Sequence, residues 1–352
     1  MTTDFGSEPD DTAGAWQAFH IFYAASPRPL LLQCVEPLID ELTAEGLLAG
    51  HFFINYWMEG PHVRLRLRPS SPDAAAPVRE RAEQAIAEFL RKRPALYEMP
   101  PGYLDEYYDK LFDLEYSPDQ RERMTGSDGR MRLRANNTFS TEEYEPEYAK
   151  YGGPAGVALA EWHFRHSSGL VLTANRTLNL HLRTVALGFS AQLMMVMSGC
   201  LLADDDLLLD FFERYYAYWD GASASPEATD RAGFDRVYET ADASPASRFR
   251  RILEAVGRDD FASMPGTLRL WAEHCRELRE RVLDLTRRGE LLFDGSEGQG
   301  GVRVTAPELT LPRLLVPYMH MTNNRLSMTI QDEAYLAFIL ARSLRESRMS
   351  AS

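Results

Sequence analysis

Residues 51–68 constrain the fold more than any other stretch, because two runs of alternating apolar and polar residues surround the sequence Glu-Gly-Pro at 59–61. This pattern is typical of two antiparallel strands joined by a tight turn. Side chains alternate between the two faces of a strand, so Val63, Leu65 and Leu67 are predicted to share the face that packs against a core.

The opposite face of the second predicted strand carries His62, Arg64, Arg66 and Arg68. Residues two apart on one strand face are roughly 6.6 Å from each other, so the three guanidinium groups form a row that can bind a carboxylate or a phosphate through paired hydrogen bonds. The alternative is the solvated outer face of a half-buried sheet. The strand has no acid to balance its arginines although the chain carries a net charge of −14, and this favours an external anion.

The acidity of the chain argues against non-specific binding to nucleic acid or to an anionic membrane. Its three cysteines, Cys34, Cys200 and Cys275, are far apart in the sequence and form no CxxC pair, so we expect buried, reduced thiols. The N-terminal residues are polar and acidic, unlike a signal peptide, and no apolar run approaches the ~18 residues that a membrane span requires. We therefore expect a cytoplasmic protein.

The first part of the chain predicts a β-α-β-β-α order: a strand at 16–25, a helix at 29–48, the hairpin, and a helix at 73–93. Such an order builds an antiparallel sheet with flanking helices, so the fold class is predicted to be α+β. We expect a disordered lead-in at 1–14 and a single domain at 15–352. Its α+β part covers 15–150 and contains an insertion at about 94–138.

The second part of the chain, 151–352, is predicted to be mainly helical. The run at 176–199 is apolar on nearly every side but is interrupted by Asn, His and Arg, which indicates the core helix of a bundle rather than a membrane span. Three prolines within 302–330 predict extended or irregular structure there. A helix at 332–345 closes the chain.

Most of the motifs that carry chemistry in other proteins are missing. His163 and His166 are three residues apart on a predicted helix near Glu161, but the HEXXH order of a zinc site is absent. There is no GxSxG elbow, no GxGxxG and no GxxxxGK[ST]. We therefore expect neither a metal nor a cofactor.

Four further residues have both a functional and a structural interpretation. Lys150 precedes a Tyr-Gly-Gly break, where free backbone amides can bind an anion, or it is an exposed lysine at the start of a helix. His320 is either a core histidine or a group that transfers protons near neutral pH. Asn324 and Arg325 either cap the local backbone or reach an anion.

Four segments of the chain together resemble a known family. They are FINYWMEGPHVRLRLR at 53–68, EYAKYGG at 147–153 followed by AEWHFRHSS at 160–168, the apolar helix opening at Arg183, and HMTNNRL at 320–326. They resemble the C-terminal, thiopeptide-type bacteriocin biosynthesis domain of lantibiotic dehydratases, which occurs fused in class I enzymes and as a separate protein in split systems. The resemblance extends from about Trp16 to Leu344.

The resemblance implies a lyase of antibiotic biosynthesis that removes glutamate from glutamylated Ser or Thr residues of a precursor peptide, leaving dehydroalanine or dehydrobutyrine. Arg64 and Arg66 match the two arginines of the family's H-x-R-x-R strand, and His320 matches the histidine before Asn-Arg-Leu. Lys150 matches a basic residue that is usually Arg, with Glu147 as the acid three residues earlier. Lysine keeps the charge and loses the bidentate fork.

The chemistry of β-elimination suits these residues. It needs a base for the Cα proton, stabilisation of the developing enolate, and a cation for the departing carboxylate. We predict that Arg64 and Arg66 supply charge, that His320 transfers the proton, and that Lys150 and Glu147 position the substrate or each other. Residues expected to bind substrate are His62, Arg68, Glu147, Asn324 and Arg325.

Two other functions stay open. Separate members of the family in thiopeptide pathways join two dehydroalanines in a formal [4+2] aza-cycloaddition that forms a pyridine and expels the leader peptide; Lys150 and the insertion fit this reaction, whereas both arginines and His320 favour elimination. A noncatalytic subunit that binds the precursor is the third possibility. The expected partners are a ribosomal precursor peptide, with its leader and core, and a separate glutamylating subunit, with no direct contact to nucleic acid or membrane.

Overall fold

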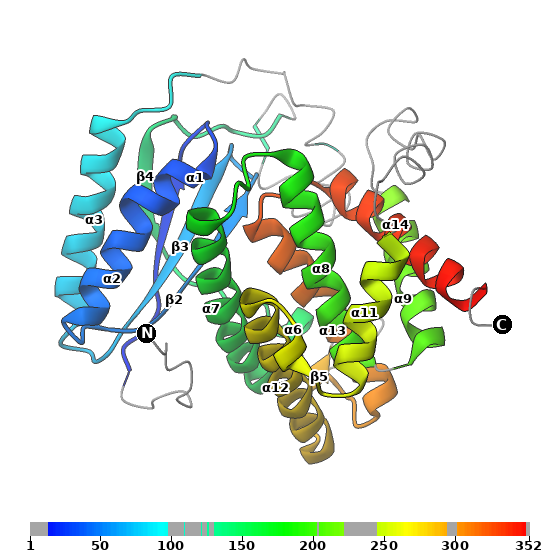
Figure 1. The fold of residues 1–352 in the computed structure, drawn as a ribbon. Coiled ribbons are helices and arrows are strands. Elements are labelled where there is room, and N and C mark those ends of the chain that lie inside the picture. The colour runs from blue at the N-terminus through cyan, green and yellow to red at the C-terminus, as the bar shows by residue number, and fades with distance from the viewer. Residues whose placement is uncertain are drawn as a thin grey trace. The chain divides into compact units, whose positions relative to one another are not determined.

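The computed structural model describes residues 13–97, 109, 121, 125–126, 130–202, 204–221, 245–293 and 301–349 (Figure 1). Two compact units make up the chain. The first comprises Met1–Pro146 and Phe164–Leu178, and the second comprises Glu147–His163 and Asn179–Ser352. Nearly all of the predicted lead-in at 1–14 and most of the predicted insertion at 94–138 lie outside the described residues, so these two predictions stay predictions, as does the single domain.

The first unit contains a four-stranded antiparallel sheet with the strand order β2-β3-β1-β4. The predicted β-α-β-β-α start and the α+β class are confirmed. The elements are β1 (Gln17–Phe22), α1 (Pro27–Leu30), the π-helical turn η1 (Leu31–Val35), α2 (Glu36–Ala44), β2 (Leu48–Tyr56), β3 (His62–Pro69), α3 (Ala75–Lys92) and β4 (Thr138–Glu142).

The predicted hairpin is formed by β2 and β3. Its turn closes with a hydrogen bond from the Gly60 N–H to the Trp57 carbonyl at 3.0 Å. Gly60 has a φ of 107°. An L side chain is strained at that angle, so this position requires glycine.

The apolar face of β3 packs against a core, as its alternation predicts. Val63, Leu65 and Leu67 are buried, and Leu65 lies opposite Phe19 of β1 and Phe53 of β2 in the sheet register. Helices α2 and α3 lie along the sheet in Figure 1, and both contact its strands. Burial of these aliphatic side chains contributes about 1.5–3 kcal/mol each to the free energy of unfolding.

The basic face of β3 is also covered, which the alternation alone does not predict. Phe52 lies opposite Arg66 in the register of β2 and β3. The rings of Trp16, Tyr144 and Phe164 pack against Phe52 at centroid distances of 4.9, 6.1 and 5.6 Å. The basic residues near Phe52 therefore lie among aromatic rings rather than on a solvated outer face.

The second unit is mainly helical, as predicted. The helix α7 (Gly153–Thr177) contributes its first residues to this unit and its last residues to the first unit. The other elements are α6 (Tyr148–Tyr151), α8 (Arg183–Leu202), α9 (Asp205–Gly221), α11 (Pro245–Gly257), the 3-10 turn η2 (Phe261–Ser263), α12 (Gly266–Arg288), the short strands β5 (Leu292–Phe293) and β6 (Val302–Arg303), α13 (Pro307–Arg325) and α14 (Ile330–Met349).

Helix α8 is a core helix of the second unit. Of the helices in the described ranges, it alone is long and apolar enough to cross a membrane by length and composition, and 78% of its most apolar window is buried inside the protein. Burial on this scale is typical of a bundle core, so the prediction of a core helix in this part of the chain is confirmed.

The prediction of extended or irregular structure at 302–330 was wrong, because most of this stretch forms α13. Pro307 lies at the start of the helix, where the backbone N–H of any residue lacks a partner within the helix, so a proline costs nothing there. Pro312 and Pro317 lie inside the helix. An internal proline costs about 3 kcal/mol. Buried side chains along the helix, including Leu314 and Tyr318, offset that cost.

Candidate functional site

The basic strand β3 places the predicted anion-binding side chains on one face of the sheet. His62 and Arg64 lie opposite Phe22 and His20 of the neighbouring strand β1, so the two histidines and the arginine share that face. The His20 ring lies 5.1 Å from the His62 ring. The alternation of side chains in β1 could have identified His20 as part of this cluster.

The guanidinium group of Arg64 contacts the ring of Tyr56 and the imidazole of His62. Its guanidinium carbon lies 3.5 Å from the centre of the Tyr56 ring, and its Nε–H donates to His62 Nε2 at 3.1 Å. The other ring nitrogen of His62, Nδ1, donates to the Gly60 carbonyl at 2.8 Å. Arg64 is thus oriented by two contacts, and no described carboxylate forms an ion pair with it.

Arg66 is the most enclosed cation of the strand, with 6% of its surface exposed. Its Nη2 donates to His20 Nε2 at 3.2 Å, whereas its Nε and Nη1 are buried and have no hydrogen-bond partner among the described residues. Burial, with the charge of Arg64, lowers the pKa of Arg66 to about 10. The nearby carboxylate of Glu142 already accepts a hydrogen bond from Arg134 at 2.9 Å. A buried cation with unmade hydrogen bonds is costly unless an anion binds to it.

The two histidines of this cluster are electrically neutral near pH 7. Burial, followed by the charges of Arg64 and Arg66, lowers the pKa of His20 to about 2. Burial is also the main cause that lowers the pKa of His62 to about 3. Both rings therefore accept hydrogen bonds from the arginines and add no positive charge.

Arg68, at the end of the same row, faces the N-terminal segment. Its Nε–H donates to the Gly14 carbonyl at 3.4 Å, and its guanidinium lies 5.9 Å from the Trp16 ring. Its predicted role in substrate binding stays a prediction.

Lys150 and Glu147 form a pair at helix α6 of the second unit. The Lys150 ammonium lies 3.3 and 3.4 Å from the two oxygens of the Glu147 carboxylate. Both side chains are exposed, so this ion pair contributes little to stability. Helix α6 ends at Tyr151 and is capped by Gly152, whose φ is 88°. A Cβ at this position would lie 3.0 Å from Cζ of Phe293, so a substitution here would be strained.

His320 lies on α13 beside a buried acid. Its Nδ1 is 2.7 Å from Oε1 of Glu333 in α14, and its ring stacks on Trp219 of α9 at a centroid distance of 4.7 Å. Part of the ring is open, since 24% of the side chain is exposed. The sequence had not singled out Glu333, because nothing in its local context distinguishes it from a helix-capping acid.

The remaining predicted substrate-binding residues lie at the C-terminal end of α13. Arg325 is 1% exposed and donates from Nη1 to the Met321 carbonyl at 2.7 Å, and burial lowers its pKa to about 9. A ligand would reach this guanidinium only if the surrounding helices moved. Asn324 is half-buried, and its carbonyl accepts a hydrogen bond from Ser327 N–H at 2.9 Å.

His163 takes part in a buried contact with a second histidine. Its Nδ1 is 2.9 Å from Nε2 of His274 on α12. Over the described ranges, no group of three or more His, Cys, Asp or Glu side chains could hold a metal ion.

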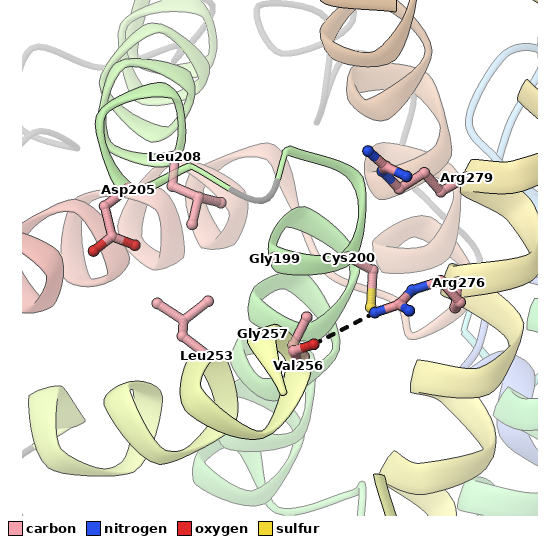
Figure 2. A pocket seen from close by; sticks show the side chains of 9 residues that line it. All are labelled: Gly199, Cys200, Asp205, Leu208, Leu253, Val256, Gly257, Arg276 and Arg279. Carbon is pink, nitrogen blue, oxygen red and sulfur yellow. Dashed lines mark hydrogen bonds between the residues drawn. The ribbon is translucent and has the colours of Figure 1, made fainter. Parts of the chain in front are cut away.

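A cavity of about 310 Å³ opens in the second unit, and none of the residues that line it is one that the sequence singled out as a site (Figure 2). Arg276, at one side of it, donates to the Val256 carbonyl at 3.4 Å and pairs with Asp259. The residues that line it are Gly199, Cys200, Asp205, Leu208, Leu253, Val256, Gly257, Arg276 and Arg279.

Comparisons with known proteins bear on both units. The family described as "Lantibiotic biosynthesis dehydratase C-term" matches residues 16–344, the span over which the resemblance was predicted. No curated protein matches the sequence.

Several solved structures are similar to this chain, and the first two named here share its fold. One is the pyridine synthase TbtD from thiomuracin biosynthesis, with a TM-score of 0.71 and 19% identity over 94% of this chain and 98% of that chain. Another is TsrL, with a TM-score of 0.67 and 17% identity over 95% of each chain. The tRNA-dependent lantibiotic dehydratase MibB from Microbispora sp. 107891 matches 98% of this chain and 29% of its own, with 16% identity and a TM-score of 0.44.

Proposed function

Because the chain belongs to the family of lantibiotic biosynthesis dehydratase C-terminal domains, we propose that it is a lyase that β-eliminates glutamate from glutamylated Ser or Thr residues of a ribosomally synthesised precursor peptide. The product is dehydroalanine or dehydrobutyrine. A separate subunit glutamylates the peptide in this proposal, because the chain carries a net charge of −14, which disfavours binding to tRNA.

The observation that carries this proposal is the unneutralised arginine pair of β3. Arg66 is buried with two nitrogens that lack a described partner, and Arg64 lies beside it with no described carboxylate. A glutamyl ester brings one carboxylate and releases another as the glutamate departs. Two guanidinium groups held by Tyr56 and His20 suit such a substrate, because charge-assisted hydrogen bonds to carboxylates are about twice as strong as neutral ones.

The bond changes assign a role to each group. A base removes the Cα proton, the electron pair forms the Cα=Cβ double bond, and the Cβ–O bond breaks to release glutamate as a carboxylate. His320 transfers the proton, since one of its ring nitrogens is bound to Glu333 and its side chain is partly exposed. Arg64 and Arg66 stabilise the developing negative charge. Lys150 and Glu147 position the substrate.

Formal [4+2] aza-cycloaddition is the second candidate function. The likeness of TbtD, a pyridine synthase, to this chain over nearly the whole of both proteins supports it. The lysine at position 150 supports it too, because a lysine cannot make the bidentate contact that an arginine offers to glutamate.

Mass spectrometry of two peptides incubated with the purified protein distinguishes the candidates. One peptide carries glutamylated serine and the other is already dehydrated at two serines. Loss of glutamate from the first, leaving dehydroalanine, is the expected result. Release of free leader peptide and a cyclised core from the second would support pyridine formation instead, and no change in either would favour a noncatalytic precursor-binding subunit.

A further inference from the structure

A hydrogen-bonded network surrounds Glu333 inside the second unit. Glu333 has 0% of its surface exposed and lies in the first turn of α14. Its Oε1 is 2.7 Å from His320 Nδ1. Its Oε2 accepts hydrogen bonds from the Tyr215 hydroxyl of α9 and from Asn323 Nδ2 of α13, the latter at 3.2 Å.

The surroundings of Glu333 favour a carboxylate. The N-terminal turn of a helix stabilises negative charge, and donated hydrogen bonds stabilise it further. Burial and the negative charge of Glu333 raise the pKa of Tyr215 well above its usual value, so the phenol keeps its proton and donates it. Arg183 of α8 pairs with Asp332, so among the described residues His320 is the basic side chain that contacts Glu333.

The orientation of the Asn323 amide follows from its contact with Glu333. An ionised carboxylate only accepts hydrogen bonds, so the amide nitrogen is the atom that faces Glu333 and donates to it. The amide oxygen then accepts from the Ser190 hydroxyl of α8 at 2.7 Å. Oε2 of Glu333 thus lies between two donors, and Oε1 is the oxygen that accepts from His320.

These contacts determine which nitrogen of His320 carries a proton. An ionised carboxylate only accepts hydrogen bonds, so Nδ1 of the neutral ring must be the protonated nitrogen. Nε2 then carries the lone pair, and the Trp219 ring, tilted by 30° to the imidazole, holds the ring plane. When Nε2 accepts a proton, the resulting imidazolium lies directly beside the Glu333 carboxylate.

We propose that Glu333 is a positioning residue that fixes His320 in the Nδ1–H tautomer, with Tyr215 and Asn323 holding the Glu333 carboxylate in place. This rests on the proposed role of His320 in proton transfer. During elimination Nε2 takes the Cα proton, the electron pair enters the new double bond, and glutamate leaves. Glu333 stays ionised and stabilises the imidazolium until solvent takes the proton from Nε2.

The variant Glu333→Gln tests the assignment, because the network dictates how glutamine would fit. Tyr215 and Asn323 both donate toward the Oε2 position, so the glutamine carbonyl must occupy it. The glutamine NH2 group then faces His320 Nδ1 and forces that nitrogen to accept. The expected result is a switch of His320 to the Nε2–H tautomer, which removes the lone pair from Nε2.

The readout is nitrogen NMR of histidine-labelled protein, in which the His320 signals are identified by their loss in His320→Gln. The wild-type protein should show Nδ1–H, and Glu333→Gln should show Nε2–H. Asp332→Asn is the matched control: it changes the adjacent acid to its amide in the same helical turn, but Asp332 caps α14 through Thr329 and contacts Arg183. It should retain Nδ1–H.

Single-turnover elimination of glutamate from a glutamylated peptide is the second readout, and Glu333→Gln should be slower by on the order of 10²-fold. A wild-type spectrum with Nε2–H, or an unchanged tautomer in Glu333→Gln, would overturn the positioning assignment even if that variant folded poorly. If the tautomer switched while the rate stayed at the wild-type value, the network would not serve catalysis. If wild-type protein eliminated nothing, the proposed function would fail while the NMR test still decided the tautomer.

Discussion

Replacing Arg66 with methionine should make the protein more stable while removing its activity. Burial and the charge of Arg64 lower the pKa of Arg66 from its usual 12.5 to about 10. A reduction of that size corresponds to about 3 kcal/mol of unfavourable free energy for the charged form in the folded protein. Methionine has a similar length and no charge, so it removes this cost. It loses the hydrogen bond to His20, worth about 1 kcal/mol, and the contact of the guanidinium carbon with the centre of the Tyr144 ring at 5.7 Å, worth about 0.5 kcal/mol. The expected gain is about 1.5 kcal/mol.

The sign of the pH dependence is specific. Because the folded-state pKa lies below the unfolded-state value, the cost is fully present at neutral pH and disappears only as the pH rises through about 10 toward 12.5. The stability advantage of Arg66→Met over wild type should therefore be constant between pH 7 and 9. Urea denaturation followed by tryptophan fluorescence at those pH values measures it.

Arg28→Met is the matched control in the first unit. Arg28 donates from Nε and Nη2 to the Asn175 carbonyl at 3.2 and 2.7 Å, so its replacement should lower the free energy of unfolding by about 1–3 kcal/mol. If Arg66→Met were destabilised as much as Arg28→Met, then Arg66 would already be neutralised within the folded chain. The argument for an external carboxylate would then be refuted.

Four further outcomes are expected. His320→Gln should slow single-turnover elimination by on the order of 10²-fold or more while leaving peptide affinity, measured by fluorescence anisotropy, near the wild-type value; a wild-type rate would remove His320 from the mechanism. Lys150→Arg should lower KM for a glutamylated peptide if this position binds the glutamate carboxylate, and an unchanged KM would speak for pyridine formation. His62→Leu should reduce the loss of stability in acid. Burial lowers the pKa of His62 to about 3, so as the pH falls from about 6.5 to about 3 this group lowers the free energy of unfolding by about 1.4 kcal/mol for each pH unit. The free energy of unfolding, measured at pH 7, 6 and 5, should therefore change less with pH in the variant than in wild type. Leu65→Ala should lower the free energy of unfolding by about 2–5 kcal/mol in urea denaturation, because Leu65 is wholly buried between Phe19 and Phe53; a loss under about 1 kcal/mol would contradict that packing.

The sheet of the first unit could be predicted because its signals are local. Alternation with a period of two residues placed Val63, Leu65 and Leu67 on one face and the basic side chains on the other, and the register bears this out. Whether the basic face was solvated could not be read from the strand. That depended on the rings that pack against Phe52, which come from residues far away in the sequence.

The C-terminal helices show the limit of propensity. Proline disfavours a helix by a local rule, yet α13 continues through Pro312 and Pro317 because its burial against neighbouring helices outweighs that rule. The pairing of His320 with Glu333 was likewise hidden. It depends on the turn between α13 and α14 and on side chains from α8 and α9, which no spacing along the chain encodes.

We propose that the guanidinium groups of β3 receive glutamate during β-elimination. The most direct measurement is single-turnover conversion of one glutamylated peptide by wild-type protein, Arg66→Ala and Arg66→Lys. Mass spectrometry of quenched samples follows the fraction of peptide that has lost glutamate. We expect rapid loss of glutamate with wild type, accumulation of intact glutamylated peptide with Arg66→Ala, and an intermediate rate with Arg66→Lys. Dehydration by Arg66→Ala at the wild-type rate would contradict this proposal.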